Sequence, residues 1–167
     1  MNGKRRIFID MDGVLCEFKE GSTMDELQTP GYFYGLLPRP AMLEALNYLL
    51  DPDAAEVFVL SSVLPAIETA AIREKNDWLD KYLPRIDAQH RIFPLCGTDK
   101  AAAVADLRRE DVLFDDHSPN LVKWHAAGGT PVKILNEING KQGSFQAGPR
   151  VRITKREDLY AVLQGGV

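Results

Sequence analysis

The sequence lacks several features that would place it in particular classes of protein. Two cysteines, Cys16 and Cys96, among 167 residues are too few for the disulfide framework of a small secreted protein. No apolar run approaches the roughly 18 residues of a membrane span. Residues 1–6, Met-Asn-Gly-Lys-Arg-Arg, lead directly into a predicted strand and not into a signal peptide. We therefore expect a cytoplasmic protein with no membrane partner.

Positive charge is also scarce. Lysine and arginine number 20 against 24 acidic residues, which gives a formal net charge of −4, so we expect no nucleic-acid polymer as a partner. Among the three histidines, His90 and His125 have no second ligand at the spacing of a metal site. A small anionic substrate would need local positive charge or a metal ion to bind this acidic chain.

Predicted strands alternate with predicted helices along the chain. The strands are expected at 6–10, 56–61, 91–95, 111–115 and 131–135, and the helices at 41–50, 65–82 and 99–109, after Ser118, and before Gly165. This alternation predicts one α/β domain over residues 1–167, doubly wound around a parallel sheet. A segment rich in glycine and proline, residues 17–40, follows the first strand directly.

Two carboxylates stand at the end of the first predicted strand. Residues 10–14 read Asp-Met-Asp-Gly-Val, and Gly13 allows the backbone to turn sharply beside a ligand. One carboxylate can then act as a nucleophile in phosphoryl transfer, and the other as general acid and base. An ordinary Asp-Gly turn after a strand is the alternative interpretation, and these five residues do not decide between the two.

Polar side chains also follow two further apolar runs. Asp115 and Asp116 end one run, and Ser61 and Ser62 follow another. The carboxyl ends of the strands form the ligand-binding edge of an open α/β sheet. Adjacent carboxylates repel each other unless a cation compensates them, and with Asp10 they form the all-oxygen set that Mg²⁺ prefers. Ser61 can donate to a phosphate oxygen, or it can simply cap the following helix.

These strand ends resemble the motifs of the haloacid dehalogenase (HAD) superfamily, on its phosphatase side. Residues 10–14 match the first motif, Ser61 the second, and Asp115 with Asp116 the fourth. The resemblance implies a Rossmann-like, HAD-type parallel sheet with a small cap insertion after the first strand, here at about residues 17–40. It also implies a Mg²⁺-dependent phosphomonoesterase.

Within that superfamily the chain resembles the 5'(3')-deoxyribonucleotidases. The similarities are Asp-Met-Asp-Gly-Val-Leu at 10–15 with Phe18, Pro-Gly-Tyr-Phe at 30–33, Leu-Pro-Arg-Pro at 37–40, and Glu-Lys-x-x-Trp at 74–78. This resemblance covers roughly residues 5–135 and implies a nucleoside monophosphate substrate that Phe18 faces. Segment 17–40 is shorter than the helical cap of those enzymes, so the substrate is less firmly implied than the chemistry.

The resemblance also assigns roles to the acids. Asp10 would be the nucleophile, and Asp12 the general acid and base, with its main-chain carbonyl as a metal ligand. Asp116 would be the direct metal ligand, and Asp115 would support it. Ser61 and Ser62 would hold the phosphate together with a lysine.

Two lysines compete for that last role. Lys75 lies in the Glu-Lys-x-x-Trp stretch, and it requires the region 65–82 to break before residue 73. Lys100 lies at the start of the predicted helix 99–109, where many HAD members keep this lysine. The sequence does not decide between them.

Other functions remain open. A phosphatase for sugar or other small phosphates would keep every catalytic residue and differ in the cap. A non-catalytic phosphate-binding module belongs to another class, whereas a dehalogenase would not need Asp12. The aromatic residues Tyr32–Tyr34 can either stack on a substrate or pack the cap onto the core. The sequence indicates no oligomeric state.

Overall fold

In the computed structural model, residues 4–19, 21–50, 55–139 and 145–163 are described. Within these ranges six parallel strands form one sheet in the order β3-β2-β1-β4-β5-β6. The strands are β1 (Arg6–Ile9), β2 (Glu56–Leu60), β3 (Arg91–Ile92), β4 (Val112–Asp115), β5 (Thr130–Leu135) and β6 (Arg150–Arg152). This order confirms the predicted Rossmann-like sheet.

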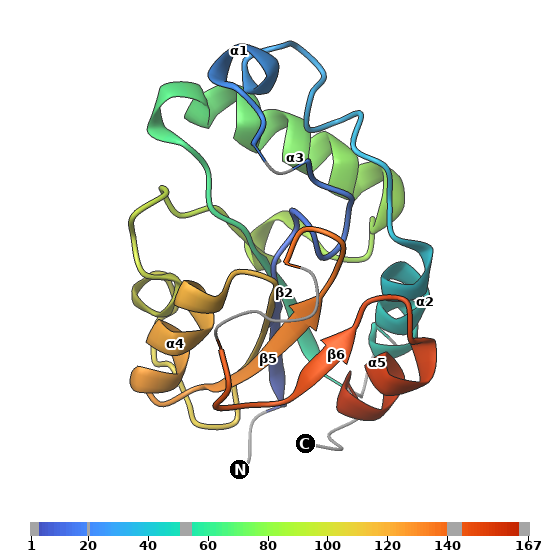
Figure 1. Cartoon of the computed structure of the whole chain (residues 1–167), viewed down its shortest axis with the longest axis vertical. Helices are drawn as coiled ribbons and strands as arrows, with labels where there is room; N and C mark the ends of the chain where they lie inside the picture. Colours follow the sequence, from blue (N-terminus) through green and yellow to red (C-terminus); the bar gives the residue numbers. More distant parts are fainter. Residues whose placement is uncertain (1–3, 20, 51–54, 140–144, 164–167) are drawn as a thin grey trace.

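Helices cover both faces of the sheet, as Figure 1 shows for α4 on one side and α2 with α5 on the other. The α-helices are α1 (Met24–Leu27), α2 (Pro40–Leu49), α3 (Glu68–Tyr82), α4 (Ser118–Ala126) and α5 (Arg156–Leu163). Three short 3₁₀ helices are η1 (Pro65–Ile67), η2 (Ala88–His90) and η3 (Lys100–Ala103). None of the helices in these described ranges is both long enough and apolar enough to cross a membrane.

Alternating side chains of β1 explain why both faces need helices. Ile7 and Ile9 are buried in the larger core cluster, which includes residues of α2, α3 and α5. Phe8 points to the opposite face and packs in a second cluster with Leu121 and Trp124 of α4. A strand that is apolar at consecutive positions fits a parallel sheet that is covered twice.

The predicted helix at 99–109 is wrong beyond its first residues. Only η3 forms. The backbone is extended at Val104 and adopts a left-handed conformation at Asp106, with a φ of 52°. Arg6 donates to the carbonyl oxygens of Ala105 and Asp106 at 3.4 and 2.8 Å. These carbonyls therefore pair with a distant arginine and not with a further helical turn.

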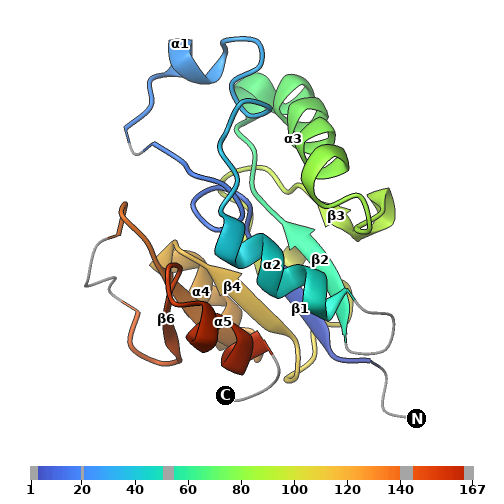
Figure 2. The ribbon, with the colours of Figure 1, turned by 90° about the vertical axis from the view of Figure 1, so that its right-hand side faces the viewer.

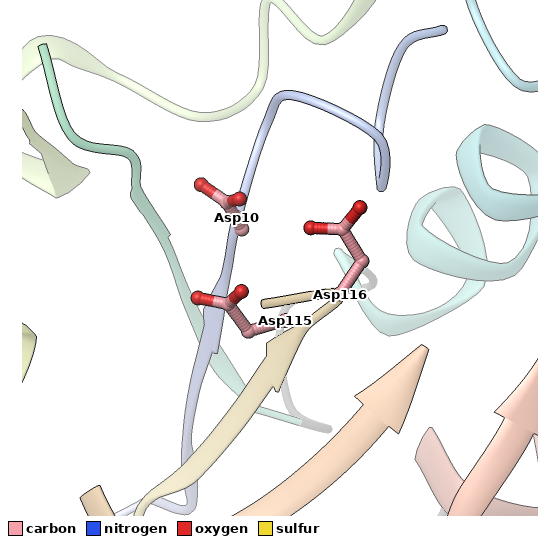
Figure 3. Close-up of side chains that lie close together, drawn as sticks. All are labelled: Asp10, Asp115 and Asp116. Carbon is pink, nitrogen blue, oxygen red and sulfur yellow. The ribbon is translucent and has the colours of Figure 1, made fainter. Parts of the chain in front are cut away.

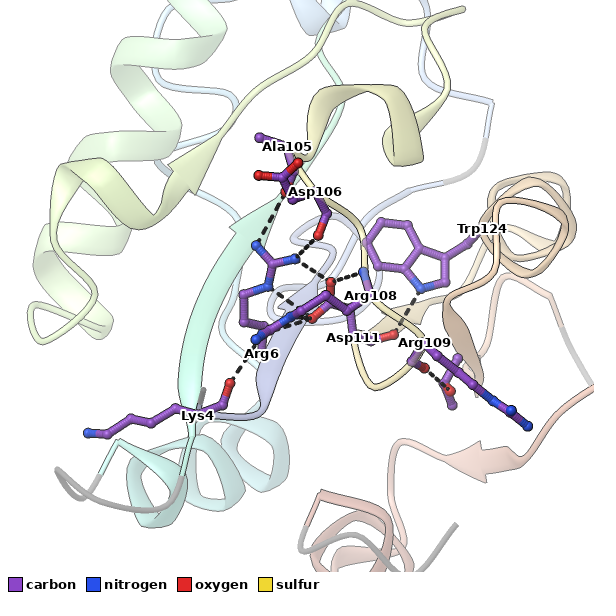
Figure 4. Close-up of polar contacts among 9 residues, drawn as sticks. Lys4, Arg6, Ala105, Asp106, Arg108, Arg109, Asp111 and Trp124 are labelled. Atoms are coloured by element: carbon purple, nitrogen blue, oxygen red, sulfur yellow. Dashed lines mark hydrogen bonds and ion pairs between the residues drawn. The ribbon is translucent and has the colours of Figure 1, made fainter. Parts of the chain in front are cut away.

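Arg6 also belongs to a network of polar contacts at the amino-terminal edge of the sheet (Figure 4). Arg6 pairs with the buried carboxylate of Asp111, which also accepts the backbone N–H of Arg108 at 2.7 Å. The indole N–H of Trp124 donates to the carbonyl oxygen of Asp111 at 3.3 Å. This network joins the start of β1 to the start of β4. The opposite ends of these two strands carry Asp10 and Asp115.

The remaining expectations differ in detail. The strand expected at 91–95 is limited to β3, and β6, with Val151 buried between two exposed arginines, was not expected. The helices expected at 41–50 and after Ser118 are present as α2 and α4. The last predicted helix, before Gly165, is present as α5, whose described residues end at Leu163. The polar region 136–149 is described apart from residues 140–144.

Candidate active site

The predicted strand ends meet at the carboxyl edge of the sheet. Asp10 follows β1, Asp115 ends the neighbouring β4, and Ser61 follows β2 on the other side of β1. The chain leaves β1 toward β2 on one side, whereas β4 lies on the other, so this edge is the switch point where open α/β sheets bind ligands. Oxygens of Asp10, Asp115 and Asp116 lie within 4.8 Å of one another, and Figure 3 shows the three carboxylates beside one another.

Gly13 is required twice in this arrangement. Its φ of +78° lies in the left-handed region that favours glycine. A Cβ atom at this position would also overlap Oδ2 of Asp116. The turn after Asp12 can therefore approach the acidic cluster only without a side chain.

Lys100 compensates two of the three acids. Its Nζ lies 2.9 Å from Oδ1 of Asp10 and 2.7 Å from Oδ2 of Asp115, and only 2% of the residue is exposed. Burial alone would lower the pKa of Lys100, but the charges of Asp10 and Asp115 raise it above its usual value. The ammonium therefore stays charged beside the candidate nucleophile.

Lys75 serves the other acid. Its Nζ donates to Oδ2 of Asp12 at 2.6 Å and to Oγ of Ser61 at 2.9 Å, and the side chain is fully buried. The region 65–82 divides at Ile67 into η1 and α3, which is the break before residue 73 that this alternative required. The structure thus brings both candidate lysines to the strand ends.

Asp12 keeps one oxygen free of the lysine. Its Oδ1 is buried and has no hydrogen-bond partner among the residues that the structure describes. Burial raises the pKa of Asp12, although the neighbouring Lys75 opposes this change. A partly buried carboxyl group, with one oxygen on a lysine and the other buried and unpaired, is suited to holding and releasing a proton.

The two adjacent acids differ in their partners. Asp115 is fully buried, and its oxygens accept hydrogen bonds from the backbone N–H of His117 at 2.7 Å and from Asn120 at 2.9 Å, besides Lys100. Burial raises the pKa of Asp115. Burial, and then the charges of Asp10 and Asp115, raise the pKa of Asp116 to about 7. Asp116 is therefore the less compensated of the two.

Asn136, directly after β5, is a site residue that the sequence analysis missed. Its Nδ2 donates to Oδ2 of Asp116 at 2.7 Å and to the carbonyl oxygen of Gly13 at 2.8 Å. It thereby ties the turn after β1 to the end of β4. The signal was available, because Asn136 follows a predicted strand in the same way as Asp10 and Ser61 do.

Two other predicted residues are not brought into these contacts. Ser62 and Phe18 are half-buried, and within the described ranges neither side chain makes a hydrogen bond or a contact between rings. Their roles stay predictions. Among the cap aromatics, Phe33 packs with Val63, Ile67 and Ala71, whereas Tyr34 is 44% exposed.

The donor set at the strand ends fits Mg²⁺. Asp10, Asp115 and Asp116 offer oxygen atoms only, and Lys100 alone does not balance three carboxylates. The two ends of segment 17–40 lie side by side. The backbone N–H of Glu17 donates to the carbonyl oxygen of Leu37 at 2.8 Å, and the backbone N–H of Arg39 donates to the carbonyl oxygen of Leu15 at 2.9 Å.

A family model and two curated relatives match this chain. The model of the family "5' nucleotidase, deoxy (Pyrimidine), cytosolic type C protein" matches residues 23–141, more than two thirds of the chain. Proteins from two strains of Staphylococcus epidermidis, both named "Putative 5'(3')-deoxyribonucleotidase", are 28% identical over 102 residues. That alignment covers 61% of this chain and 50% of each relative, so it spans about half the length of these curated relatives.

Solved structures share the fold over nearly the whole chain. A D,D-heptose 1,7-bisphosphate phosphatase from Burkholderia thailandensis has a TM-score of 0.62 at 16% identity, covering 96% of both chains. The D,D-heptose 1,7-bisphosphate phosphatase from B. bronchiseptica, complexed with magnesium and phosphate, has a TM-score of 0.59 at 19% identity and covers 96% of both chains. A HAD family hydrolase from Deinococcus radiodurans R1 has a TM-score of 0.62 at 14% identity, covering 96% of this chain and 95% of that one. These likenesses confirm a HAD-type fold.

Proposed function

The chain belongs to the 5' nucleotidase, deoxy (pyrimidine), cytosolic type C family, and on that premise we propose that it hydrolyses nucleoside monophosphates through an aspartyl-phosphate intermediate. The observation that carries the proposal is that each of the two acids after β1 has a buried lysine of its own. Lys100 contacts Asp10, and Lys75 contacts Asp12. The two acids therefore have different charged partners, which suits one acid as the nucleophile and the other as the proton donor.

In the first half of the reaction, a carboxylate oxygen of Asp10 attacks phosphorus, and the bond from phosphorus to the leaving oxygen breaks. Asp12 gives its proton to that oxygen, so the nucleoside leaves as an alcohol. Lys75 and Ser61 donate to the phosphate oxygens, where negative charge collects in the transition state. Lys100 holds the Asp10 carboxylate in place through their ion pair.

In the second half, Asp12 takes a proton from water, whose oxygen attacks phosphorus and releases inorganic phosphate and the Asp10 carboxylate. Asp10, Asp116 and the carbonyl oxygen of Asp12 would hold Mg²⁺, with Asp115 supporting Asp116. When bound, Mg²⁺ would screen the charges of the carboxylate and the phosphate, so that they can approach each other.

The substrate tests the proposal most directly. A deoxyribonucleoside monophosphate should be hydrolysed with a higher kcat/KM than common sugar phosphates. Phe18→Ala should lower that kcat/KM by about ten- to a hundredfold, the cost of losing a base stack, while sparing p-nitrophenyl phosphate. Steady-state kinetics on a panel of nucleotides and sugar phosphates measures both effects.

The shortness of segment 17–40 favours a second candidate, a phosphatase for sugar or other small phosphates. A flat profile across the panel, unchanged by Phe18→Ala, would establish that alternative. No hydrolysis of p-nitrophenyl phosphate with Mg²⁺ present would instead point to a non-catalytic phosphate-binding module.

Both lysines should prove necessary. Lys75→Met and Lys100→Met should each lower kcat by at least about a hundredfold, because each removes a cation from the phosphate or the nucleophile. Lys100→Met should also cost more unfolding free energy, on the order of 3–5 kcal/mol, because it strands two buried carboxylates. Denaturant unfolding and p-nitrophenyl phosphate kinetics report the two effects.

Lys123→Met is the matched control for this pair. Lys123 lies on α4, is about half exposed, and pairs with the exposed Asp99. Its loss should change stability by less than about 1 kcal/mol and leave kcat unaltered. Full kcat in either site variant would remove that lysine from the proposed site.

A further inference from the structure

Two segments contact each other, and of their residues only Lys75 has a role in the chemistry above. The Pro-Gly-Tyr-Phe segment at 30–33 lies in the insertion, and the Glu-Lys-x-x-Trp segment at 74–78 lies on α3. Figures 1 and 2 both show the chain after α1 running beside α3 before it reaches α2. The two segments are therefore neighbours in space, although about 40 residues separate them in sequence.

Glu74 makes the central contact. Its Oε1 accepts the backbone N–H of Gly31 at 2.7 Å, and its Oε2 accepts the backbone N–H of Phe33 at 3.0 Å. Only 6% of Glu74 is exposed. Both oxygens of this buried carboxylate thus accept hydrogen bonds from main-chain N–H groups. Such bonds to a charged acceptor are strong.

The conformation of Gly31 makes this contact possible. Its φ of +86° lies in the left-handed region, and a Cβ atom would meet nothing within 4 Å. The glycine is therefore required by the backbone turn and not by lack of space. This turn aims the N–H groups of Gly31 and Phe33 at Glu74, whereas the N–H of Tyr32 between them donates to the carbonyl oxygen of Thr29 at 3.0 Å.

Two further residues of the same helix extend the contact. Trp78 lies one turn after Glu74, and its indole N–H donates to the carbonyl oxygen of Leu36 at 2.8 Å. Lys75, next to Glu74, has its Nζ 5.1 Å from the centroid of the Phe33 ring. The ammonium is thus held between Asp12 and Ser61 on one side and an aromatic ring on another.

We propose that Glu74 is a positioning residue for the phosphate-binding lysine. It fixes the backbone of Gly31 and Phe33, so that the Phe33 ring holds the Lys75 ammonium toward Asp12 and Ser61. The inference rests on the proposed function, because it assigns Lys75 to the phosphate. It gives the insertion a task in binding every phosphate monoester, independent of the group that carries the phosphate.

The test compares Glu74→Gln with Glu68→Gln, an exposed acid in the first turn of the same helix. Glu74→Gln keeps the shape of the side chain, but its amide can accept only one of the two N–H donors. Hydrogen exchange at Gly31 and Phe33 should become about tenfold faster, with strand amides unchanged. Glu68→Gln should leave all these exchange rates as they are.

The functional readout is the affinity for inorganic phosphate, measured by calorimetry with Mg²⁺ present, together with KM. Glu74→Gln should weaken phosphate binding by about three- to thirtyfold, the range of a cation–π contact, and raise KM for p-nitrophenyl phosphate and for a nucleotide by the same factor. Phe33→Leu, which keeps apolar volume but loses the ring, should give the same shift. The double variant should add little to either single change.

Several results would overturn the inference. Unchanged exchange at Gly31 and Phe33 would remove the contact, and faster exchange with unchanged phosphate affinity would make it structural only. A rise in KM confined to the nucleotide would mean that the segment contacts the nucleoside and not the lysine. A wild-type protein that binds phosphate but hydrolyses nothing would overturn the proposed function, while the calorimetric comparison would still decide the role of Glu74.

Discussion

Replacing Asp10 with asparagine should abolish turnover and leave the fold intact. The side-chain amide is nearly isosteric with the carboxylate, but it cannot attack phosphorus to form the acyl phosphate. We expect kcat for p-nitrophenyl phosphate to fall at least about a thousandfold, in line with the loss of a covalent nucleophile. Asp10→Asn removes one of three clustered carboxylates and leaves Lys100 paired with Asp115, so we do not expect it to destabilise the protein.

The matched control is Asp158→Asn, an exposed acid on α5 that pairs with Lys155 at the surface. It should leave kcat unchanged, and both variants should show the wild-type circular dichroism spectrum. Mass spectrometry after an acid quench should find a phosphoryl adduct on wild-type Asp10 and none on Asp10→Asn. Substantial phosphatase activity in a clean preparation of Asp10→Asn would refute the covalent mechanism.

The sheet could be predicted from the sequence because its signal is local. Ile7, Phe8 and Ile9 are apolar at consecutive positions, as a strand buried on both faces requires. The helix predicted at 99–109 failed for the opposite reason. The carbonyl oxygens that end it, those of Ala105 and Asp106, pair with Arg6, about a hundred residues earlier in the chain. A prediction from the residues around 99–109 alone cannot include Arg6.

The same distinction holds for the candidate site. Asp10, Ser61 and Asp115 could be identified because each ends a predicted strand, and parallel strands bring their carboxyl ends to one edge. The two lysines could not be ranked, since the reach of Lys75 depends on how α3 packs over the sheet. The role of Asn136 needed the strand order, which places β5 next to β4.

Removing Mg²⁺ should eliminate activity, and adding it back should restore the full rate. Three carboxylates within 4.8 Å of one another, with Lys100 contacting two of them, leave negative charge that a phosphate monoester would have to meet. Mg²⁺ should also raise the melting temperature of the phosphate-free protein, because it binds the folded state alone. Full activity in excess EDTA, after dialysis against chelator, would refute a metal requirement.

The two adjacent acids should respond differently to removal of their side chains. Asp116→Ala should lose most of the rise in melting temperature that Mg²⁺ produces, whereas Asp115→Ala should retain more of it. The reason is that the oxygens of Asp115 already accept hydrogen bonds from His117 and Asn120 and pair with Lys100. The reverse ranking would make Asp115 the direct ligand.

Proton competition gives this metal prediction a pH dependence of known sign. Burial raises the pKa of Asp116 to about 7 in the metal-free protein. Below that pH, Asp116 carries a proton in most molecules, and Mg²⁺ must displace it. Mg²⁺ should therefore bind more weakly at about pH 6 than at about pH 8, with roughly one proton released per ion at the lower pH. Calorimetry in buffers of different ionisation enthalpy measures both quantities. Equal Mg²⁺ affinity at the two pH values, with no proton released, would mean that Asp116 is already ionised before the metal binds, and that the acidic cluster is compensated by the protein itself.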